Sequence, residues 1–164
     1  MTDRVLCREK MLASLDRAVM EAVGFFADVD ENLSDGNQTA RQALSHLVFW
    51  HREYVNVIRA LAECQPYTLK SGTFAELNEQ AYEEFQTYSM WELADRLACL
   101  QEELVEYLQR LTYWRMDFPV KQGGRFWSVE DRIPAIEGHI RNHVLRLRKA
   151  ARKAQAEADY RKAS

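Results

Sequence analysis

Two of the four histidines in this 164-residue chain stand four residues apart, in the segment Ile136-Glu-Gly-His-Ile-Arg-Asn-His-Val-Leu-Arg-Leu. The segment has the spacing of an amphipathic helix, on which residues four apart share one face. His139 and His143 could therefore bind one divalent metal ion, provided that a third ligand comes from elsewhere and a coordination position stays open. The same spacing is also typical of polar or half-buried histidines that bind nothing.

The third ligand would come from His46 or His51, which lie together on another expected helix. The apolar residues of that helix define one face, made of Ala43, Leu47, Trp50, Tyr54, Ile58 and Leu61. His51 falls within this face and His46 lies at its edge, about 140° away, so the two cannot point the same way. Periodicity alone makes His51 the more inward residue. A pocket between helices is often lined from such an edge, however, and both histidines remain candidates.

The elements that must position these residues are indicated by capping boxes, in which Ser or Thr is followed three residues later by Gln, Glu or Asp. Such boxes begin at Thr39, Thr73, Ser89 and Ser128. We expect helices over about 3–29, 39–63, 73–87 and 89–114, and from 128 onward, with Pro134 in the first two turns of the last. No segment alternates at period two, so no sheet is expected. The prediction is an all-α four-helix bundle with a short extra helix between its second and third long helices.

Length and composition predict a single domain spanning residues 1–164, because 47% hydrophobic and 29% charged residues suit a sizeable core. No apolar run approaches the roughly 20 residues of a membrane span. The charged N-terminal segment does not resemble a secretory signal, so we expect a cytoplasmic protein with no membrane partner. Cys7, Cys64 and Cys99 fit neither a disulfide framework nor a C-x-x-C motif and are predicted to be packed, reduced thiols.

The net charge of −3 conceals a basic C-terminal segment, about 150–164, which we expect to extend the last helix. Aromatic residues that could stack on bases are not interleaved with its cations, apart from Tyr160. We therefore expect no nucleic-acid partner and interpret the cations as a solvated helix end that complements the helix dipole. Contact with an anion is the alternative.

Several metal and catalytic motifs are absent from the sequence. No histidine follows a glutamate by three residues, as a di-iron bundle requires, and there is no H-E-x-x-H, G-x-S-x-G or phosphate loop. A single-metal site built from histidines alone is the arrangement that remains.

The segment Gln42-Ala-Leu-Ser-His46-Leu-Val-Phe-Trp50, followed far downstream by His139-Ile-Arg-Asn-His143, resembles the DinB-like superfamily of four-helix bundles. Within it the chain is most similar to the ClbS/DfsB branch, through Trp50, through 73–82 and through 126–129. The resemblance runs from about residue 4 to residue 150. Members of that branch often carry Tyr where His46 stands and lack the paired histidines. The chain thus combines a ClbS/DfsB-like body with a DinB-like metal site.

The resemblance implies that His46, His139 and His143 bind one divalent metal, zinc or nickel, with His51 as a core histidine or a supporting group. It also implies hydrolysis or thiol transfer on a small reactive or toxic molecule in stress protection, with a low-molecular-weight thiol as an optional cofactor. We expect a homodimer. The alternative is a metal-free bundle that acts as a dimeric ligand-binding or interaction protein.

The substrate pocket would be lined by residues able to reach the same cavity as the histidines. Those expected there are Trp50, Tyr54, His51, Tyr82 and Trp127. Trp50 and Tyr54 stand four apart, a spacing equally typical of core residues. Glu137 points about 200° away from His139 on the helix, so we do not expect it to act as a general base.

Overall fold

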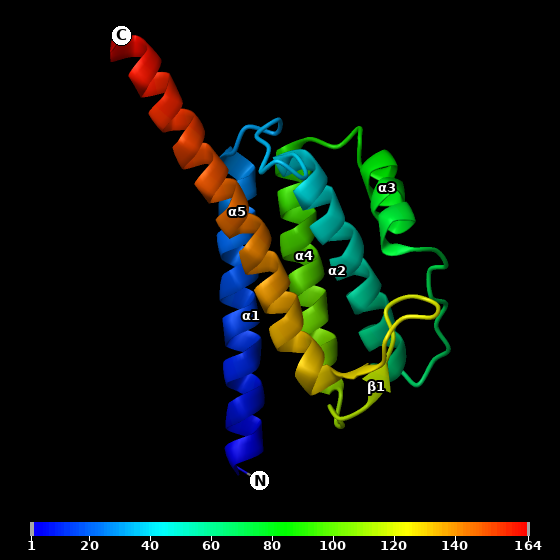
Figure 1. Cartoon of the computed structure of the whole chain (residues 1–164). Coiled ribbons are helices and arrows are strands. Elements are labelled where there is room, and N and C mark those ends of the chain that lie inside the picture. Colours follow the sequence, from blue (N-terminus) through cyan, green and yellow to red (C-terminus); the bar gives the residue numbers. More distant parts are fainter. Residues whose placement is uncertain (1, 164) are drawn as a thin grey trace.

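Four long helices pack side by side in the computed structural model, which describes residues 2–163 and the side chains of residues 5–163 (Figure 1). The elements in chain order are α1 (Thr2–Asp28), α2 (Ala40–Ala62), α3 (Phe74–Glu84), α4 (Met90–Arg110), β1 (Asp117–Phe118), β2 (Trp127–Ser128) and α5 (Val129–Ala163). The short α3 lies outside α2, in the connection between the second and third long helices. The predicted all-α four-helix bundle is confirmed.

The long helices do not simply alternate in direction. His51 of α2 is hydrogen-bonded to Gln101 of α4, about midway along both helices, whereas Arg8 near the start of α1 donates to the carbonyl of Thr112 just beyond α4. Figure 1 shows that α1 and α5 run one way and α2 and α4 the other. The connection that holds α3 carries the chain back along the bundle, which allows α2 and α4 to be parallel.

Three of the helices begin with a complete capping box. The side chains of Thr39, Thr73 and Ser89 each accept a hydrogen bond from the backbone amide three residues later, and the side chain of that residue accepts one in return. Ser128 similarly accepts from the amide of Asp131 at 3.1 Å. These bonds satisfy amides that a helix start leaves free, so the predicted starts of α2 to α5 are confirmed to within a residue.

The segment between α4 and α5 differs from the prediction in two ways. Helix α4 ends at Arg110 rather than near 114, because the indole of the buried Trp114 folds back and donates to the carbonyls of Leu108 and Leu111 at 3.1 and 3.2 Å. The expectation of no sheet was also wrong, since β1 and β2 pair antiparallel. Two residues per strand are too few for alternation to be visible in the sequence.

The core fills the space between the four long helices. Its largest fully buried side chains are aromatic, namely Trp114, Phe26, Phe49, Phe85 and Phe118. Residues 43–51 of α2 are buried without interruption. This stretch is covered on more than one side, because α2 packs against α3, α4 and α5. Residues on different faces of α2 can therefore all be buried.

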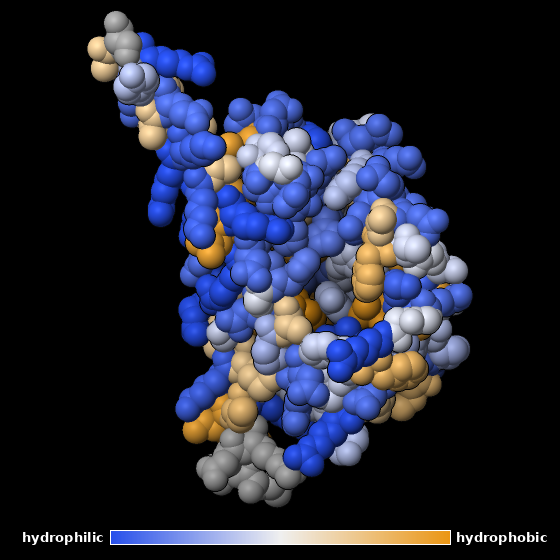
Figure 2. All heavy atoms as spheres, viewed as in Figure 1, coloured by the Kyte–Doolittle hydropathy of each residue, from blue (hydrophilic) through white to orange (hydrophobic). Residues whose placement is uncertain are grey.

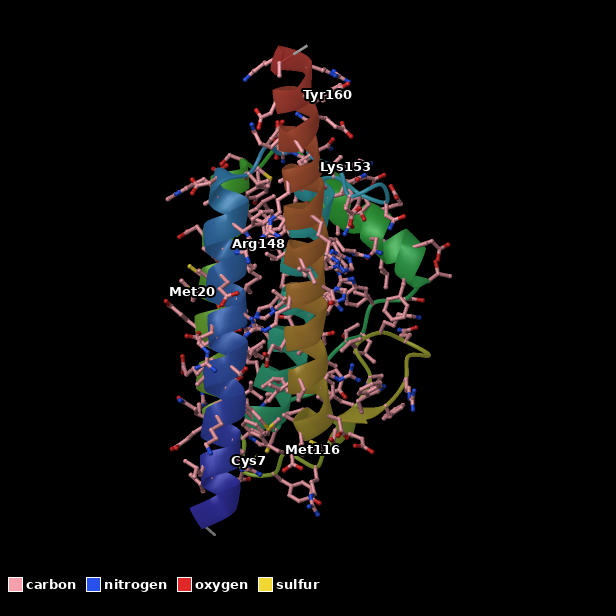
Figure 3. All side chains as sticks on the ribbon, turned by 60° about the vertical axis from the view of Figure 1, so that its left-hand side comes forward. Cys7, Met20, Met116, Arg148, Lys153 and Tyr160 are labelled. Atoms are coloured by element: carbon pink, nitrogen blue, oxygen red, sulfur yellow. The ribbon has the colours of Figure 1, made fainter. Side chains whose placement is uncertain are left out.

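The cysteine prediction was half wrong. Cys7, Cys64 and Cys99 are free thiols, as expected, but all three are exposed rather than packed. Cys7 lies on the outer surface of α1 (Figure 3). Cys64 follows the last turn of α2 with a φ of 52°, a left-handed conformation of the kind that ends helices.

Helix α5 runs unbroken through Pro134 and continues past the bundle to Ala163. Lys153 and Tyr160 lie on this projecting part (Figure 3), whose surface is largely hydrophilic (Figure 2). Pro134 falls in the second turn of the helix, where one lost hydrogen bond does not interrupt a helix of 35 residues. Among the described residues, no helix has the length and apolar character needed to cross a membrane.

Candidate metal centre and adjoining pocket

His46, His139 and His143 meet at one point between α2 and α5. The Nε2 atoms of His46 and His139 are 2.7 Å apart, and those of His143 and His139 are 3.3 Å apart. One ring nitrogen from each residue lies within 4.8 Å of the other two. Helices α2 and α5 are antiparallel. His46 on α2 faces the two histidines that lie one turn apart on α5.

The ring of His46 is held by Asn78 of α3. Its Nδ1–H donates to Asn78 Oδ1 at 2.8 Å, and the indole Nε1–H of Trp50 donates to the same oxygen at 3.1 Å. An amide oxygen only accepts, so the proton of a neutral His46 resides on Nδ1. The Nε2 lone pair is then directed at the other two histidines, which is the arrangement found in histidine ligands of metal sites.

The ring of His143 has polar neighbours on its Nδ1 side. The side-chain amide of Gln38 lies 2.6 Å from Nδ1, and the guanidinium of Arg146 lies 3.3 Å from it. Arg146 also forms an ion pair with the buried carboxylate of Asp35 at 3.2 Å. An amide can present its oxygen or its nitrogen to the same position. As placed, the amide nitrogen of Gln38 and Arg146 both donate to Nδ1, which leaves the proton of neutral His143 on Nε2. For Nε2 to serve as a ligand, the proton must move to Nδ1, Gln38 must turn its oxygen toward it, and Arg146 must point elsewhere.

All three imidazoles are neutral at neutral pH. The pKa of His139 is lowered to about 4 and that of His143 to about 3, in both cases mainly by desolvation and to a smaller extent by the neighbouring histidines and Arg146; Asp35 partly opposes the shift of His143. Burial also lowers the pKa of His46, although its hydrogen bond to Asn78 opposes this. Metal ligation requires neutral imidazole, so these environments favour the form that binds.

A pocket of about 340 Å³ opens beside the histidines. It is lined by His46, Trp50, Tyr54, Phe74, Val120, Gly124, Arg125, Trp127, Arg132, Ala135 and His139. The ring centroids of Trp50 and Phe74 are 5.3 Å apart, which makes an aromatic wall. Two of the three histidines thus form part of the pocket wall, while His143 lies behind them.

The structure brings Trp50, Tyr54 and Trp127 into this pocket and leaves His51 and Tyr82 outside it. His51 is buried between α2 and α4, where its Nε2 is hydrogen-bonded to Gln101 at 2.9 Å and burial lowers its pKa to about 4. It is a core histidine, the alternative that the sequence left open. Tyr82 lies half-buried near the end of α3.

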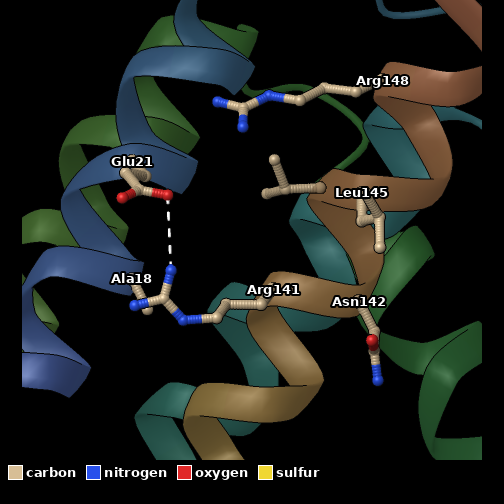
Figure 4. Close-up of a pocket in the computed structure, with 7 residues that line it drawn as sticks. Ala18, Glu21, Arg141, Asn142, Leu145 and Arg148 are labelled. Atoms are coloured by element: carbon tan, nitrogen blue, oxygen red, sulfur yellow. Dashed lines mark hydrogen bonds and ion pairs between the residues drawn. The ribbon is translucent and has the colours of Figure 1, made fainter.

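Glu137 points away from the histidines, as expected. Its Oε1 accepts hydrogen bonds from Ser14 at 2.8 Å and from Arg141 at 3.0 Å. Beside it, a second concavity between α1 and α5 holds about 250 Å³ (Figure 4). There Arg141 also pairs with Glu21 at 3.4 Å. None of the three histidines lines this concavity, and its one carboxylate, Glu21, is paired with Arg141.

The residues of the site that were missed in the sequence include Gln38, Asn78, Phe74 and Arg132. Three of them lie in the loop before α2 or on α3, elements outside the helices that carry the histidines. Arg132 stands seven residues before His139, two turns away on the same helix, and this helical spacing was the only available signal.

Comparison with known proteins finds similarity in structure and none in sequence. No family model matches the chain, and no curated protein matches it. YfiT from Bacillus subtilis, described as a probable metal-dependent hydrolase with an unusual four-helix bundle topology, superposes with a TM-score of 0.72 at 15% identity, covering 90% of this chain and 87% of YfiT.

Two further structures superpose comparably. The sibling lethal factor precursor DfsB gives a TM-score of 0.70 at 15% identity, covering 90% of this chain and 96% of DfsB. A mycothiol-dependent maleylpyruvate isomerase gives 0.69 at 12% identity, covering 85% of this chain and 60% of the isomerase. These proteins are DinB-like four-helix bundles. The chain has the DinB-like four-helix-bundle fold, with a three-histidine cluster compatible with a divalent metal.

Proposed function

We propose that the protein is a metal-dependent enzyme that carries out hydrolysis or thiol transfer on a small molecule bound beside His46 and His139. The observation that carries this proposal is the convergence of three neutral imidazoles at the wall of a pocket. His46 and His143 are buried and His139 is exposed at the pocket, and three ring nitrogens directed at one point favour a shared cation.

The donor set fits a divalent ion such as zinc or nickel. Zinc–nitrogen bonds of about 2.0–2.1 Å place tetrahedral ligand atoms about 3.3 Å apart. The nitrogens of His143 and His139 are at that separation, and those of His46 and His139 are closer at 2.7 Å. Three protein ligands leave a position for water or substrate, and a bound ion would supply Lewis acidity that makes water or a thiol a nucleophile near neutral pH.

The chain's own residues would position the substrate and the ligands. Asn78 keeps the proton of His46 on Nδ1, so that Nε2 stays available. Trp50, Phe74 and Trp127 surround the pocket with aromatic surface, which excludes water from an apolar substrate and packs against it. The pocket's volume lies at the lower end of the range for small-molecule sites.

The solved structures support a choice between two reactions. YfiT is described as a probable metal-dependent hydrolase, and the isomerase as mycothiol-dependent. Water and a low-molecular-weight thiol are therefore the two nucleophiles that we propose for this chain. Protection against a reactive or toxic molecule is the biological role that suits either reaction, and we propose a homodimer as the assembly.

One observation favours a second candidate, a metal-free ligand-binding protein. The separation of 2.7 Å between His46 and His139 is also a hydrogen-bond distance, with His139 Nε2–H donating to His46 Nε2. In that case the pocket would bind its ligand without chemistry, and ligand binding would not require a metal ion.

Turnover measurements separate the two candidates. Protein stripped with a chelator and reconstituted with zinc or nickel would be assayed for hydrolysis of p-nitrophenyl acetate and for conjugation of a thiol to 1-chloro-2,4-dinitrobenzene. The proposal predicts turnover that requires the metal and is lost in His139→Ala but kept in Asn142→Ala, an exposed position on the same helix. Ligand binding without metal-dependent turnover of either probe would favour the second candidate.

A further inference from the structure

The pocket beside the histidines carries two arginines and no acidic residue. Arg125 and Arg132 both line it, and no carboxylate side chain contributes to its wall. None of the ion pairs formed by the described side chains includes either arginine. A concave site lined by charge of one sign attracts a ligand of the opposite sign.

Arg132 is the more deeply placed cation, with only 8% of its surface exposed. Its Nη2 donates to the carbonyl of Phe118 and, at 3.1 Å, to that of Arg125, and its guanidinium also bonds the hydroxyl of Tyr54. Its Nε is buried without a partner. The groups to which it is hydrogen-bonded are all neutral. Buried charges are normally paired, so the charge of Arg132 has no counter-ion within the described part of the protein.

Arg125 stands at the rim of the same pocket. Its side chain is exposed and its guanidinium lies 5.2 Å from the ring of Trp127. Because its carbonyl accepts from Arg132, the two residues are held next to each other. The pocket therefore has one buried cation and a second that is free to approach a bound ligand.

The rest of the pocket wall is mainly apolar. Trp50, Phe74, Val120 and Trp127 form much of it. A ligand that matches this surface has an apolar or aromatic body that buries against these side chains, together with one negative group that reaches a guanidinium. A carboxylate suits the site better than a phosphate, because a doubly charged group loses more hydration in a small apolar cavity.

We propose that the pocket selects small carboxylic acids with an apolar or aromatic body, their carboxylate bound by Arg132 with help from Arg125. This inference rests on the proposed function, because it takes the pocket beside the histidines as the substrate site. Because Nη2 of Arg132 already donates to two carbonyls and its Nε is buried, the donors left for a carboxylate are on Nη1 of Arg132 and on the guanidinium of Arg125. The acid group would anchor the molecule while its body lies along the wall formed by His46 and His139.

Calorimetric titration of phenylacetate and of its neutral analogue phenylacetamide tests the proposal. The full-length protein is used after chelator treatment, so that a carboxylate cannot bind to a metal and the result does not depend on whether the histidines hold one. Phenylacetate is expected to bind at least about tenfold more tightly than phenylacetamide, as hydrogen bonds to a charged group allow.

Variants assign the preference to the arginines. Arg132→Gln is expected to abolish the preference by weakening phenylacetate binding much more than phenylacetamide binding, Arg132→Lys to restore part of it, and Arg125→Gln to reduce it a few-fold. Arg125 is exposed, so its variant remains informative if Arg132→Gln fails to fold. Arg115→Gln is the control, because it removes a positive charge that pairs with Glu130 outside this pocket.

Equal affinities for the acid and the amide, or no binding of either, would overturn the proposal. So would a preference that Arg125→Gln and Arg132→Lys leave unchanged, or that Arg115→Gln reduces as much as they do. Metal binding by the histidines would stand in each of these cases. A carboxylate preference in a protein that binds no metal would instead support this inference and contradict the proposed function.

Discussion

The oxygen of Asn78 accepts from both His46 and Trp50, which links the metal centre to the aromatic wall of the pocket. Replacing Asn78 with Ala removes the acceptor that fixes the tautomer of His46. We expect zinc affinity to fall about 10- to 100-fold, as for other groups that orient metal ligands. Competition with a chromogenic chelator measures this. Asn78→Asp keeps an acceptor and should retain most of the affinity, and Gln80→Ala, exposed on the same helix, should change nothing.

His51 makes stability depend on pH. Its pKa is about 4 in the folded protein, below the ordinary value of 6.5, because the ring is fully buried. Between these values the unfolded chain binds a proton that the folded chain does not, so stability falls as pH decreases from about 6.5 to 4. The loss from this residue is on the order of 3 kcal/mol.

Urea denaturation of the wild type and of His51→Gln across this pH range measures the effect. Glutamine does not titrate and can still donate to Gln101, so the difference in stability between the two proteins should narrow as the pH is lowered. A difference in stability that does not change with pH would contradict this account. It would mean that His51 carries the same charge in the folded and unfolded states, although it is buried in the folded protein.

The three-histidine set followed from helical spacing and family resemblance, but the choice between His46 and His51 could not be made from periodicity. Periodicity finds the more apolar face of a helix. Residues 43–51 of α2 are buried on several faces, so His51 points into the contact with α4 while His46 points toward α5. Asn78 and Gln38 could not be predicted, because their roles depend on how α3 and a loop pack against the site.

The short helix α3 positions Asn78 and Phe74 although it contributes little to the core. Its start depends on the capping box between Thr73 and Glu76. We expect Thr73→Ala to destabilise α3 by about 1 kcal/mol. Amide hydrogen exchange measures this, and it should become faster in α3 alone. Zinc affinity should fall less than it does in Asn78→Ala.

Thr87→Ala is the matched control for that variant, because Thr87 is exposed and lies after the end of α3. If Thr73→Ala leaves exchange in α3 unchanged, the capping box does not hold the helix. If exchange rises across the whole bundle instead, α3 is part of the cooperative core rather than a separate element.

The helices could be predicted at the scale of elements because each start has its own local signal. Thr39, Thr73, Ser89 and Ser128 all satisfy free amides at the predicted positions. The end of α4 had no such signal, since it depends on where the indole of Trp114 packs. The pairing of β1 with β2 also had no local signal in the sequence, because it joins residues on either side of an eight-residue loop, 119–126.

At the scale of the whole molecule, the bundle and the projecting end of α5 should be energetically separate. Residues 152–163 are almost entirely exposed and the surface there is mainly hydrophilic (Figure 2). Truncation after Lys153 is expected to change the free energy of unfolding by no more than about 0.5 kcal/mol and to leave zinc affinity unchanged.

Leu147→Ala, in the buried part of the same helix, serves as the positive control and should cost about 2–5 kcal/mol in urea denaturation. A truncated protein that loses stability on that scale would show that the end of α5 packs against something the bundle needs, such as a second copy of the chain.

The presence of a metal is the central claim, and elemental analysis of protein purified without a histidine tag tests it most directly. Wild type would be compared with the His139→Ala, His143→Ala double variant and with Asn142→Ala, which changes an exposed residue between the two ligands. We predict about one divalent ion per chain in the wild type and in Asn142→Ala, and none in the double variant. Wild-type protein that contains no metal and takes up neither zinc nor nickel when they are added would contradict the three-histidine metal centre.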